Sequence, residues 1–462
     1  MSRVLLIVYD NDSFIHWFPL NIGYIASVLR NKEHEVTIYN QDVYHYPETH
    51  LTEYLNKNKF DVVGIGVVGG YYQYRKLLKI SNAVNSSDNR QDFLYVLGGH
   101  GPSPEPKFFL KKTKSDVVCI GEGDRTIVDL LEHTNSLNKV KGIAYRENNE
   151  FYINKPRELI KDIDNIPFPA WDLFPMDYYS LLRLPHIKNN ERSFPVITTR
   201  GCNFKCNFCY RMYKGIRIRS IDNVIEEIKI LKKEYNISYI VFADELFMTS
   251  IERTRDICES FISNELNIKW SCNGRLNYVQ DSLLKTMKKA GCVFINFGIE
   301  SMDDKVLKNM NKNLTAKCIE DGIKTCIKNK ISPGLNMLFG NIGDNENTLN
   351  KAVRFLLKYD DQSQLRTIRP VTPYPGSMLY DFAIKNNMLS DVEDFYEKKH
   401  INSDLLSINF TDLSDDEFHK LLFKANKKLI ENYFDSLKRK TIKEAEKLYF
   451  NKNANFRGFR TT

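Results

Sequence analysis

Three cysteines within eight residues are the part of this sequence best suited to hold a metal cofactor. Cys202, Cys206 and Cys209 lie in a loop rich in glycine, asparagine and aromatic residues, after an apolar run at 194–199 that predicts a short buried strand. Thiolates are the natural ligands of iron–sulfur clusters, which usually take four of them. Because no fourth cysteine lies nearby, the spacing predicts a cluster with one iron open to a small molecule, much as a catalytic zinc keeps one position free.

Two other interpretations of these cysteines fit less well. A zinc site would normally show paired Cys-x-x-Cys knuckles or downstream histidine pairs, and neither occurs. Three cysteines that only filled a core would rarely share one polar loop. The cysteines expected to be small buried hydrophobic residues lie instead in predicted helices or strands: Cys258, Cys272, Cys292, Cys318 and Cys326.

The cysteine spacing, with the aromatic Phe208 before the last cysteine, resembles that of the radical S-adenosylmethionine enzymes. The resemblance implies a 4Fe-4S cluster on Cys202, Cys206 and Cys209, whose open iron binds the amino and carboxylate groups of S-adenosylmethionine. Reductive cleavage of that molecule would then yield a 5′-deoxyadenosyl radical. An electron donor such as flavodoxin or ferredoxin is implied as a partner.

The composition is that of an ordinary enzyme. With 462 residues, 42% hydrophobic and 27% charged, the chain is long enough for two or three domains and is not wholly disordered. The net charge of +8 comes from lysines spread along the chain, so nucleic-acid binding is not expected. Nine cysteines without secreted-type spacing, no run of eighteen apolar residues and no signal peptide predict a cytoplasmic protein without a membrane span.

Residues 1–140 alternate between strand and helix patterns, which predicts a doubly wound, Rossmann-like parallel sheet. The expected strands are 4–9, 35–39, 61–66, 93–98 and 116–120. Ligands of such sheets bind beyond the carboxyl ends of the strands. Glycines, which let a backbone approach a ligand closely, follow the last three strands. Tight turns explain any single glycine, but three glycine-bearing loops at one edge favour a ligand site.

The stretches 19–24, 97–102 and 120–124 resemble the cobalamin-binding domain that precedes the radical domain in one large subfamily. The resemblance implies that cobalamin lies against these loops, with the candidate contacts Gly98, Gly99, His100, Gly121 and Glu122. Many cobalamin domains carry Asp-x-His-x-x-Gly, whose histidine ligates cobalt, and none of the nine histidines here stands in that setting. Members of the subfamily commonly lack the motif, so base-off cobalamin without a protein histidine is implied. His100 is the nearest candidate contact, with simple loop packing as the alternative.

Residues 141–195 predict a hairpin followed by an ordered, proline-rich linker. Trp171 and Phe174 in this linker are expected to pack rather than to contact a substrate.

Residues 196–385 contain six strand–helix units, which predict a partial (β/α)6 barrel with right-handed crossovers. The expected strands are 196–199, 239–242, 269–272, 293–298, 335–339 and 364–369. Polar residues follow these strands, at the end where such folds place their sites. The resemblance implies that they bind S-adenosylmethionine: Asp244, Glu245, Arg275, Glu300 and Ser301. Arg275 suits a carboxylate because its fork matches two oxygens. For each residue alone, a surface ion pair is the alternative.

Residues 386–462 predict a helical extension with amphipathic helices at 413–432 and 434–449, followed by a poorly ordered basic end. This extension either closes the open side of the barrel or contacts substrate.

The resemblance spans about residues 1–385 and predicts a cobalamin-dependent radical S-adenosylmethionine enzyme that methylates an unactivated carbon of a small molecule. In this hypothesis one S-adenosylmethionine recharges cobalamin and a second supplies the radical. Two alternatives stay open. One is a radical enzyme of cyclisation, rearrangement or oxidation, as in anaerobic porphyrin-ring formation, and the other is a cobalamin-binding sensor with a structural cluster. The sequence does not identify the substrate.

Overall fold

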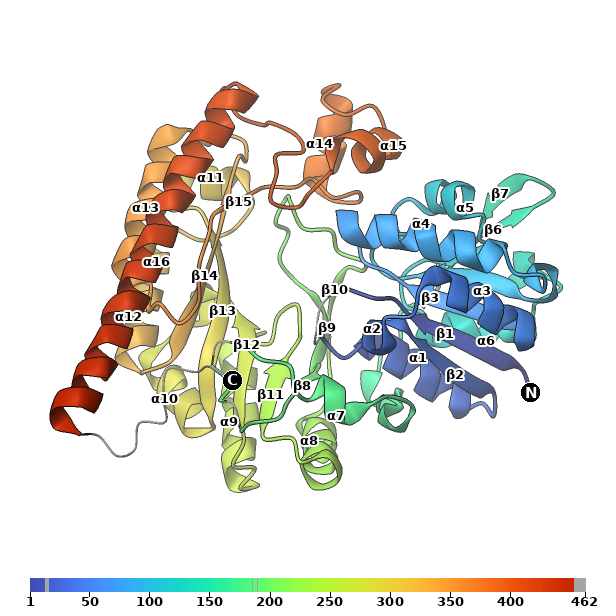
Figure 1. Cartoon of the computed structure of the whole chain (residues 1–462), viewed down its shortest axis with the longest axis horizontal. Coiled ribbons are helices and arrows are strands. Elements are labelled where there is room, and N and C mark those ends of the chain that lie inside the picture. The colour runs from blue at the N-terminus through green and yellow to red at the C-terminus, as the bar shows by residue number, and fades with distance from the viewer. Residues whose placement is uncertain (13–15, 185, 189, 453–462) are drawn as a thin grey trace.

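Two sheets form the body of the protein, with a small hairpin between them (Figure 1). The structure is a computed structural model, and it describes residues 1–12, 16–184, 186–188 and 190–452. The α/β class predicted from the sequence is confirmed, with a Rossmann-like sheet followed by an open half-barrel.

The first sheet has seven strands in the order β2-β1-β3-β4-β5-β6-β7. They are β1 (Arg3–Val8), β2 (Glu35–Asn40), β3 (Val62–Gly66), β4 (Leu94–Gly98), β5 (Val117–Cys119), β6 (Ile143–Glu147) and β7 (Glu150–Ile153). The helices are α1 (Leu20–Arg30), α2 (Gln41–Tyr44), α3 (Glu48–Lys57), α4 (Tyr71–Asn85), α5 (Pro106–Thr113) and α6 (Asp124–Glu132). The first five strands are parallel, as predicted.

The hairpin β6–β7 differs from the prediction because it continues this sheet instead of standing apart in the linker. β6 pairs antiparallel with β5, and β7 pairs with β6. A short edge strand leaves backbone groups unpaired, and β5 has only 3 residues. The hairpin therefore covers the edge of the sheet that β5 would otherwise expose.

Strand β1 shows how the sheet is buried on both faces. Because successive side chains of a strand point to opposite faces, Val4 and Leu6 join the core that also fills the half-barrel, whereas Leu5 and Ile7 join a second core. α1 and α6 pack together, and α4 packs with both α3 and α5. A parallel sheet with helices on both faces explains the continuous apolar run of β1.

The second sheet has six parallel strands in the order β15-β14-β13-β12-β11-β8. They are β8 (Ser193–Val196), β11 (Tyr239–Phe242), β12 (Lys269–Gly274), β13 (Cys292–Glu300), β14 (Ser332–Phe339) and β15 (Arg369–Pro370). The helices are α8 (Ile221–Tyr235), α9 (Ile251–Ser263), α10 (Asp281–Lys289), α11 (Asp304–Asn309), α12 (Ala316–Lys328) and α13 (Glu346–Tyr359). β15 is shorter than the predicted 364–369. Pro370 lacks an N–H for the ladder, and the buried Arg366 side chain instead bonds the Pro333 carbonyl at 3.0 Å.

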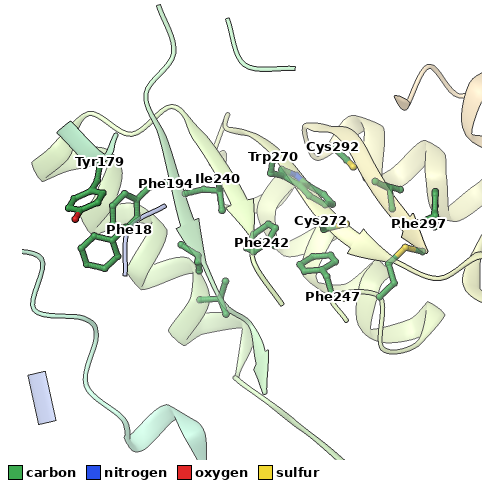
Figure 2. Packing of buried hydrophobic residues seen from close by; sticks show 14 of the residues in the cluster. Phe18, Tyr179, Phe194, Ile240, Phe242, Phe247, Trp270, Cys272, Cys292 and Phe297 are labelled. Atoms are coloured by element: carbon green, nitrogen blue, oxygen red, sulfur yellow. The ribbon is translucent and has the colours of Figure 1, made fainter. Parts of the chain in front are cut away.

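One apolar core runs from the first region into the half-barrel (Figure 2). Phe18, just before α1, lies 4.8 Å from both Phe174 and Phe194, between ring centroids. Trp171 and Phe174 are buried, so the packing role predicted for them is confirmed. Farther along this core lies Trp270, in a fully buried aromatic group. Four of the five cysteines expected inside are buried, and Cys318 is partly exposed.

The C-terminal extension is helical, as predicted, but it is built around one long helix. Its helices are α14 (Met378–Lys385), α15 (Val392–Asp394) and α16 (Asp415–Asn451), and the linker holds α7 (Met176–Tyr179). α16 starts with a capping box between Ser414 and Glu417, and no glycine or proline interrupts it. It lies along α13 at the outer edge of the molecule (Figure 1). The predicted disordered end falls on 453–462, outside the described residues.

Among the described helices, none is both long enough and apolar enough to cross a membrane.

Candidate active site

The three cysteines lie on a loop between two short paired strands. β9 (Thr199–Cys202) pairs antiparallel with β10 (Gly215–Ile218), and Cys202, which pairs with Gly215, sits at the loop end of this hairpin. Gly201 has φ +96°, and a Cβ there would lie 2.4 Å from the Gly215 oxygen, so only glycine fits. Between the second and third cysteines, Asn207 donates to the Met310 and Asn309 carbonyls at 3.0 Å and accepts from the Leu379 N–H at 2.8 Å. The loop is therefore tied to α11 and α14.

The surroundings of the loop favour a thiolate at Cys206, whereas burial raises the pKa of the Cys202 thiol. The Arg275 guanidinium lies 3.7 Å from the Cys206 sulfur and 3.5 Å from the Phe204 ring centroid. A hydrogen bond from Cys209, with the positive charges of Lys312 and Arg275, lowers the pKa of the Cys206 thiol. Three sulfurs on one loop, with cations beside them, are the donor set that an iron–sulfur cluster requires.

Two further residues predicted to bind a cofactor lie in the same polar group. The Glu300 carboxylate, at the end of β13, accepts from Lys312 Nζ at 3.0 Å, and both side chains are buried. Arg275 also donates to the Lys312 carbonyl. Ser301 is buried, and its hydroxyl accepts from the Asp303 N–H at 3.2 Å. Arg275 and Glu300 thus lie beside the cysteine loop, and Ser301 follows Glu300 in the chain.

Asp244 holds the backbone just ahead of the cysteines. It follows β11 and is 1% exposed. Its carboxylate accepts from the Thr198 N–H at 2.7 Å, from the Thr199 N–H at 2.5 Å and from both threonine hydroxyls at 3.2 and 2.8 Å. Burial raises the pKa of Asp244 to about 6. The position of Asp244 fixes where β9 begins.

A cavity of about 480 Å³ lies between the first sheet and the hairpin. It is in the range of small-molecule sites. It reaches down to β1 and β4, and the predicted site residues on its walls are Gly98, Gly99, His100, Gly121, Glu122, Asp244 and Glu245. The other predicted residues, including the three cysteines, are not among the residues that line this cavity. The hairpin β9–β10 and its loop border the cavity through Thr199, Arg200, Gly201, Met212 and Tyr213.

Comparison with known proteins matches both halves. The model of the radical SAM superfamily matches residues 196–356, and that of the B12 binding domain matches residues 9–131. An uncharacterized methyltransferase of Pyrococcus horikoshii is 30% identical over 88% of this chain and 90% of its own length. The chain belongs to the cobalamin-binding radical S-adenosylmethionine enzymes.

Two further proteins are similar to this chain at lower identity. The anaerobic magnesium-protoporphyrin IX monomethyl ester cyclase of Rubrivivax gelatinosus is 25% identical over 79% of this chain and 66% of its own length. The radical S-adenosylmethionine methyltransferase TsrM of Kitasatospora setae, solved with cobalamin and a [4Fe-4S] cluster, shares the fold. Its TM-score is 0.72 at 15% identity, over 93% of this chain and 89% of its own.

The lining of the cavity suits the cobalamin expected in this family. Gly99 has φ +100°, and a Cβ there would lie 2.4 Å from the Val67 oxygen, so the loop can turn only with glycine. Gly121 has φ +82°, and a Cβ there would meet nothing within 4 Å, so its face is open. Apolar residues of β1 form the floor. A wide apolar space bounded by bare backbone suits a large flat ligand with a long tail.

Four charged residues that the sequence analysis did not connect join the cobalamin domain to the hairpin, and we call them the arginine clamp: Arg200, Arg217, Glu122 and Asp124. Arg200 donates to Glu122 at 2.9 Å and to Asp124 at 2.7 Å, and Arg217 donates to Glu122 at 2.7 Å. Each side chain is at most 13% exposed. Two features of the sequence pointed to this clamp: the two acids in a glycine-rich loop, and the arginine two positions before Cys202. Their pairing depends on how the two domains meet.

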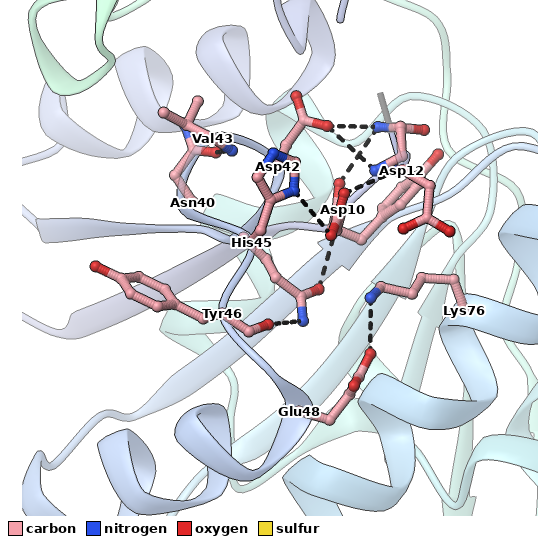
Figure 3. Close-up of polar contacts among 12 residues, drawn as sticks. Asp10, Asp12, Asn40, Asp42, Val43, His45, Tyr46, Glu48 and Lys76 are labelled. Carbon is pink, nitrogen blue, oxygen red and sulfur yellow. Dashed lines mark hydrogen bonds and ion pairs between the residues drawn. The ribbon is translucent and has the colours of Figure 1, made fainter. Parts of the chain in front are cut away.

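A second unforeseen group shapes the rim of the cavity beside β1 (Figure 3). The Asp10 carboxylate lies 3.1 Å from His45 Nδ1, and the Asn11 N–H donates to Asp42 at 3.2 Å. Asn40 caps α2 by accepting from the Val43 N–H. Since Asn11 and Asp42 both line the cavity, these contacts hold one wall in place.

Proposed function

We propose that the protein transfers a methyl group from S-adenosylmethionine, by way of cobalamin, to an unactivated carbon of a small-molecule substrate. The observation that carries this proposal is the cavity that runs from the glycine loops of the first sheet to the base of the cysteine hairpin. It is supported by the similarity to a methyltransferase over most of both chains.

In this proposal Cys202, Cys206 and Cys209 hold the cluster, and Gly98, Gly99, His100, Gly121 and Glu122 border cobalamin. When bound, the cluster with S-adenosylmethionine supplies the radical and cobalamin supplies the methyl group. The chain's own residues position these groups and limit water. Lys312 and Arg275 place positive charge beside the loop, which suits a carboxylate. Glu300, Ser301, Asp244 and Glu245 complete the proposed S-adenosylmethionine site.

Asp244 has a more specific role in this proposal than direct binding. Both of its oxygens already accept hydrogen bonds from Thr198 and Thr199. It therefore orders the backbone ahead of Cys202. Glu245, the next residue, lines the cavity and is the acid placed to contact a ligand.

Methyl transfer can be tested without knowing the substrate. Anaerobic protein loaded with cluster and cobalamin is incubated with a strong reductant and S-adenosylmethionine labelled in its methyl group. We expect S-adenosylhomocysteine and label in the corrinoid fraction, about one per protein chain. The same protein loaded with cluster alone is the control and should give 5′-deoxyadenosine without S-adenosylhomocysteine.

A cyclase function is the second candidate, because the Rubrivivax enzyme is similar over 79% of this chain. A cyclase would cleave S-adenosylmethionine to 5′-deoxyadenosine and leave the corrinoid unlabelled, and that result would exclude the methyltransferase. A cytoplasmic location and a flavodoxin or ferredoxin donor remain predictions.

A further inference from the structure

Helix α16 has two apolar faces, and only one of them is covered. Phe418, Leu422, Ala425 and Leu429 are buried on the side that packs against the half-barrel. On another side Phe423, Ile430, Phe434 and Leu437 are 71%, 37%, 54% and 46% exposed. We call these four residues the seam. At 3.6 residues per turn they lie within about 60° of one another around the helix, roughly 130° from the buried face.

The seam is placed where another molecule could reach it. α16 runs along α13 at the edge of the protein that lies far from the first sheet (Figure 1). Contiguous apolar side chains on an outer surface mark an interaction site more often than isolated ones do. Phe423, Ile430 and Leu437 are spaced seven residues apart, which is the repeat of a helix that packs along another helix.

The seam is self-complementary about Phe434. If two α16 helices pair antiparallel around a two-fold axis at Phe434, each residue faces one at a similar distance on the other side of that axis. Ile430 then meets Leu437 of the second copy, and the large Phe423 meets the small Ala445. A pairing of large with small and of β-branched with γ-branched side chains can close without gaps.

The charges beside the seam are complementary in the same arrangement. Glu431 and Lys438 lie on the same flank, three positions before and four positions after Phe434. Antiparallel pairing places Glu431 of one copy beside Lys438 of the other, and does so twice. Within one chain Glu431 pairs with Lys427 at 3.7 Å, with both side chains 58% exposed.

We propose that the protein is a homodimer in which the α16 helices of two copies pair antiparallel along the seam, flanked by two Glu431–Lys438 ion pairs. This inference does not depend on the proposed function, because no seam residue lines the cavity or the cluster loop.

Light scattering after size-exclusion chromatography of the full chain at tens of micromolar is the first test. We expect twice the chain mass of 54.0 kDa. Phe434→Glu should give a monomer with an unchanged far-ultraviolet circular dichroism spectrum. Phe450→Glu is the matched control, since Phe450 is 82% exposed on α16 but lies off the seam, and it should stay dimeric. A monomeric wild-type protein, or a Phe434→Glu variant that stays dimeric, would overturn the proposal.

A charge exchange tests the orientation of the helices. Glu431→Lys and Lys438→Glu alone should each raise the dimer dissociation constant about tenfold, because each sets like charges together at both ion-pair positions. The double variant should return to within about threefold of wild type. If the two single variants and the double variant all weaken dimerisation equally, antiparallel pairing is ruled out. Binding to phosphatidylglycerol vesicles that Phe434→Glu abolishes, in a protein that stays monomeric throughout, would assign the seam to a membrane surface instead.

Discussion

The two strand ends that face each other across the hairpin are built in opposite ways. The first sheet ends in glycines and an apolar floor, and leaves a cavity of about 480 Å³. The half-barrel ends in charged side chains that satisfy one another or the backbone, such as Glu300 with Lys312 and Asp344 with the Gly340 and Asn341 N–H groups. The strand ends of the first sheet leave room for a ligand, whereas those of the half-barrel hold the cysteine loop in place. Substitutions at the first end should therefore change ligand affinity, and substitutions at the second should change stability.

The largest effect is expected on the cysteine side of the hairpin. Replacing Cys202, Cys206 and Cys209 together by alanine should abolish the cluster, because no thiolates remain to hold iron. Reconstituted wild-type protein should hold about four irons per chain, and the variant almost none. Cys318→Ala, at a partly exposed cysteine far along the chain, should keep the full iron content. A triple variant that retains the cluster absorbance and cleaves S-adenosylmethionine would refute the assignment.

Asp244→Ala should lower the free energy of unfolding by about 3–5 kcal/mol, because two N–H groups and two hydroxyls lose a buried acceptor. Asp244→Asn keeps one acceptor oxygen and should lose less than half as much. Urea denaturation of the cobalamin-free protein measures both. Equal losses in the two variants would mean that volume, and not hydrogen bonding, explains the effect.

Glu122 belongs to both of the regions compared here, because it lines the cavity and is also part of the arginine clamp. Glu122→Ala leaves Arg200 and Arg217 short of a buried partner, so we expect a loss of about 2–3 kcal/mol in unfolding free energy. Cobalamin affinity, measured by equilibrium dialysis, should change by less than about threefold. A large loss of affinity with normal stability would instead make Glu122 a direct ligand contact.

Gly121→Ala should weaken cobalamin binding about tenfold, or about 1.4 kcal/mol, because the added methyl group points into open space where the ligand would lie. Gly215→Ala is a close control. Gly215 also has φ +82° with nothing within 4 Å of a Cβ, but it does not line the cavity. Both variants should lose similar stability, about 1 kcal/mol, from the left-handed backbone. Equal affinities in the two would show that cobalamin does not approach Gly121.

The smallest effect is expected for a substitution of His100, at the edge of the cavity. His100 is exposed, with its ring edge-on to Tyr210 at 6.0 Å. Bound cob(II)alamin should show no axial nitrogen hyperfine splitting, in the wild type or in His100→Ala, because no histidine is expected to ligate cobalt. A nitrogen splitting in the wild type that disappears in His100→Ala would show that His100 ligates cobalt.

What could be predicted from the sequence follows from periodicity and local chemistry. β1 and β3 lie within one residue of their expected places because each is a short apolar run with an aspartate close to one end, which leaves few alternatives. α16 was divided in two because its outward stripe weakens the periodic pattern near Phe434. The strand predicted at 364–369 is too long because the buried Arg366 side chain, and not a ladder of backbone hydrogen bonds, holds most of that segment. The clamp could not be predicted, since Arg200 meets Glu122 across 78 positions only after both domains have folded.

The burial of the arginine clamp has a consequence for the ionic conditions in which the protein works. Dissolved salt screens exposed charges within about 10 Å at 0.1 M, but reaches buried pairs much less. The spacing between the cobalamin cavity and the cysteine hairpin should thus stay constant as ionic strength changes. The exposed Glu431–Lys438 pairs proposed for α16 have no such protection. A rise in salt should loosen the association of two copies while the two cofactor-binding halves of each copy keep their distance.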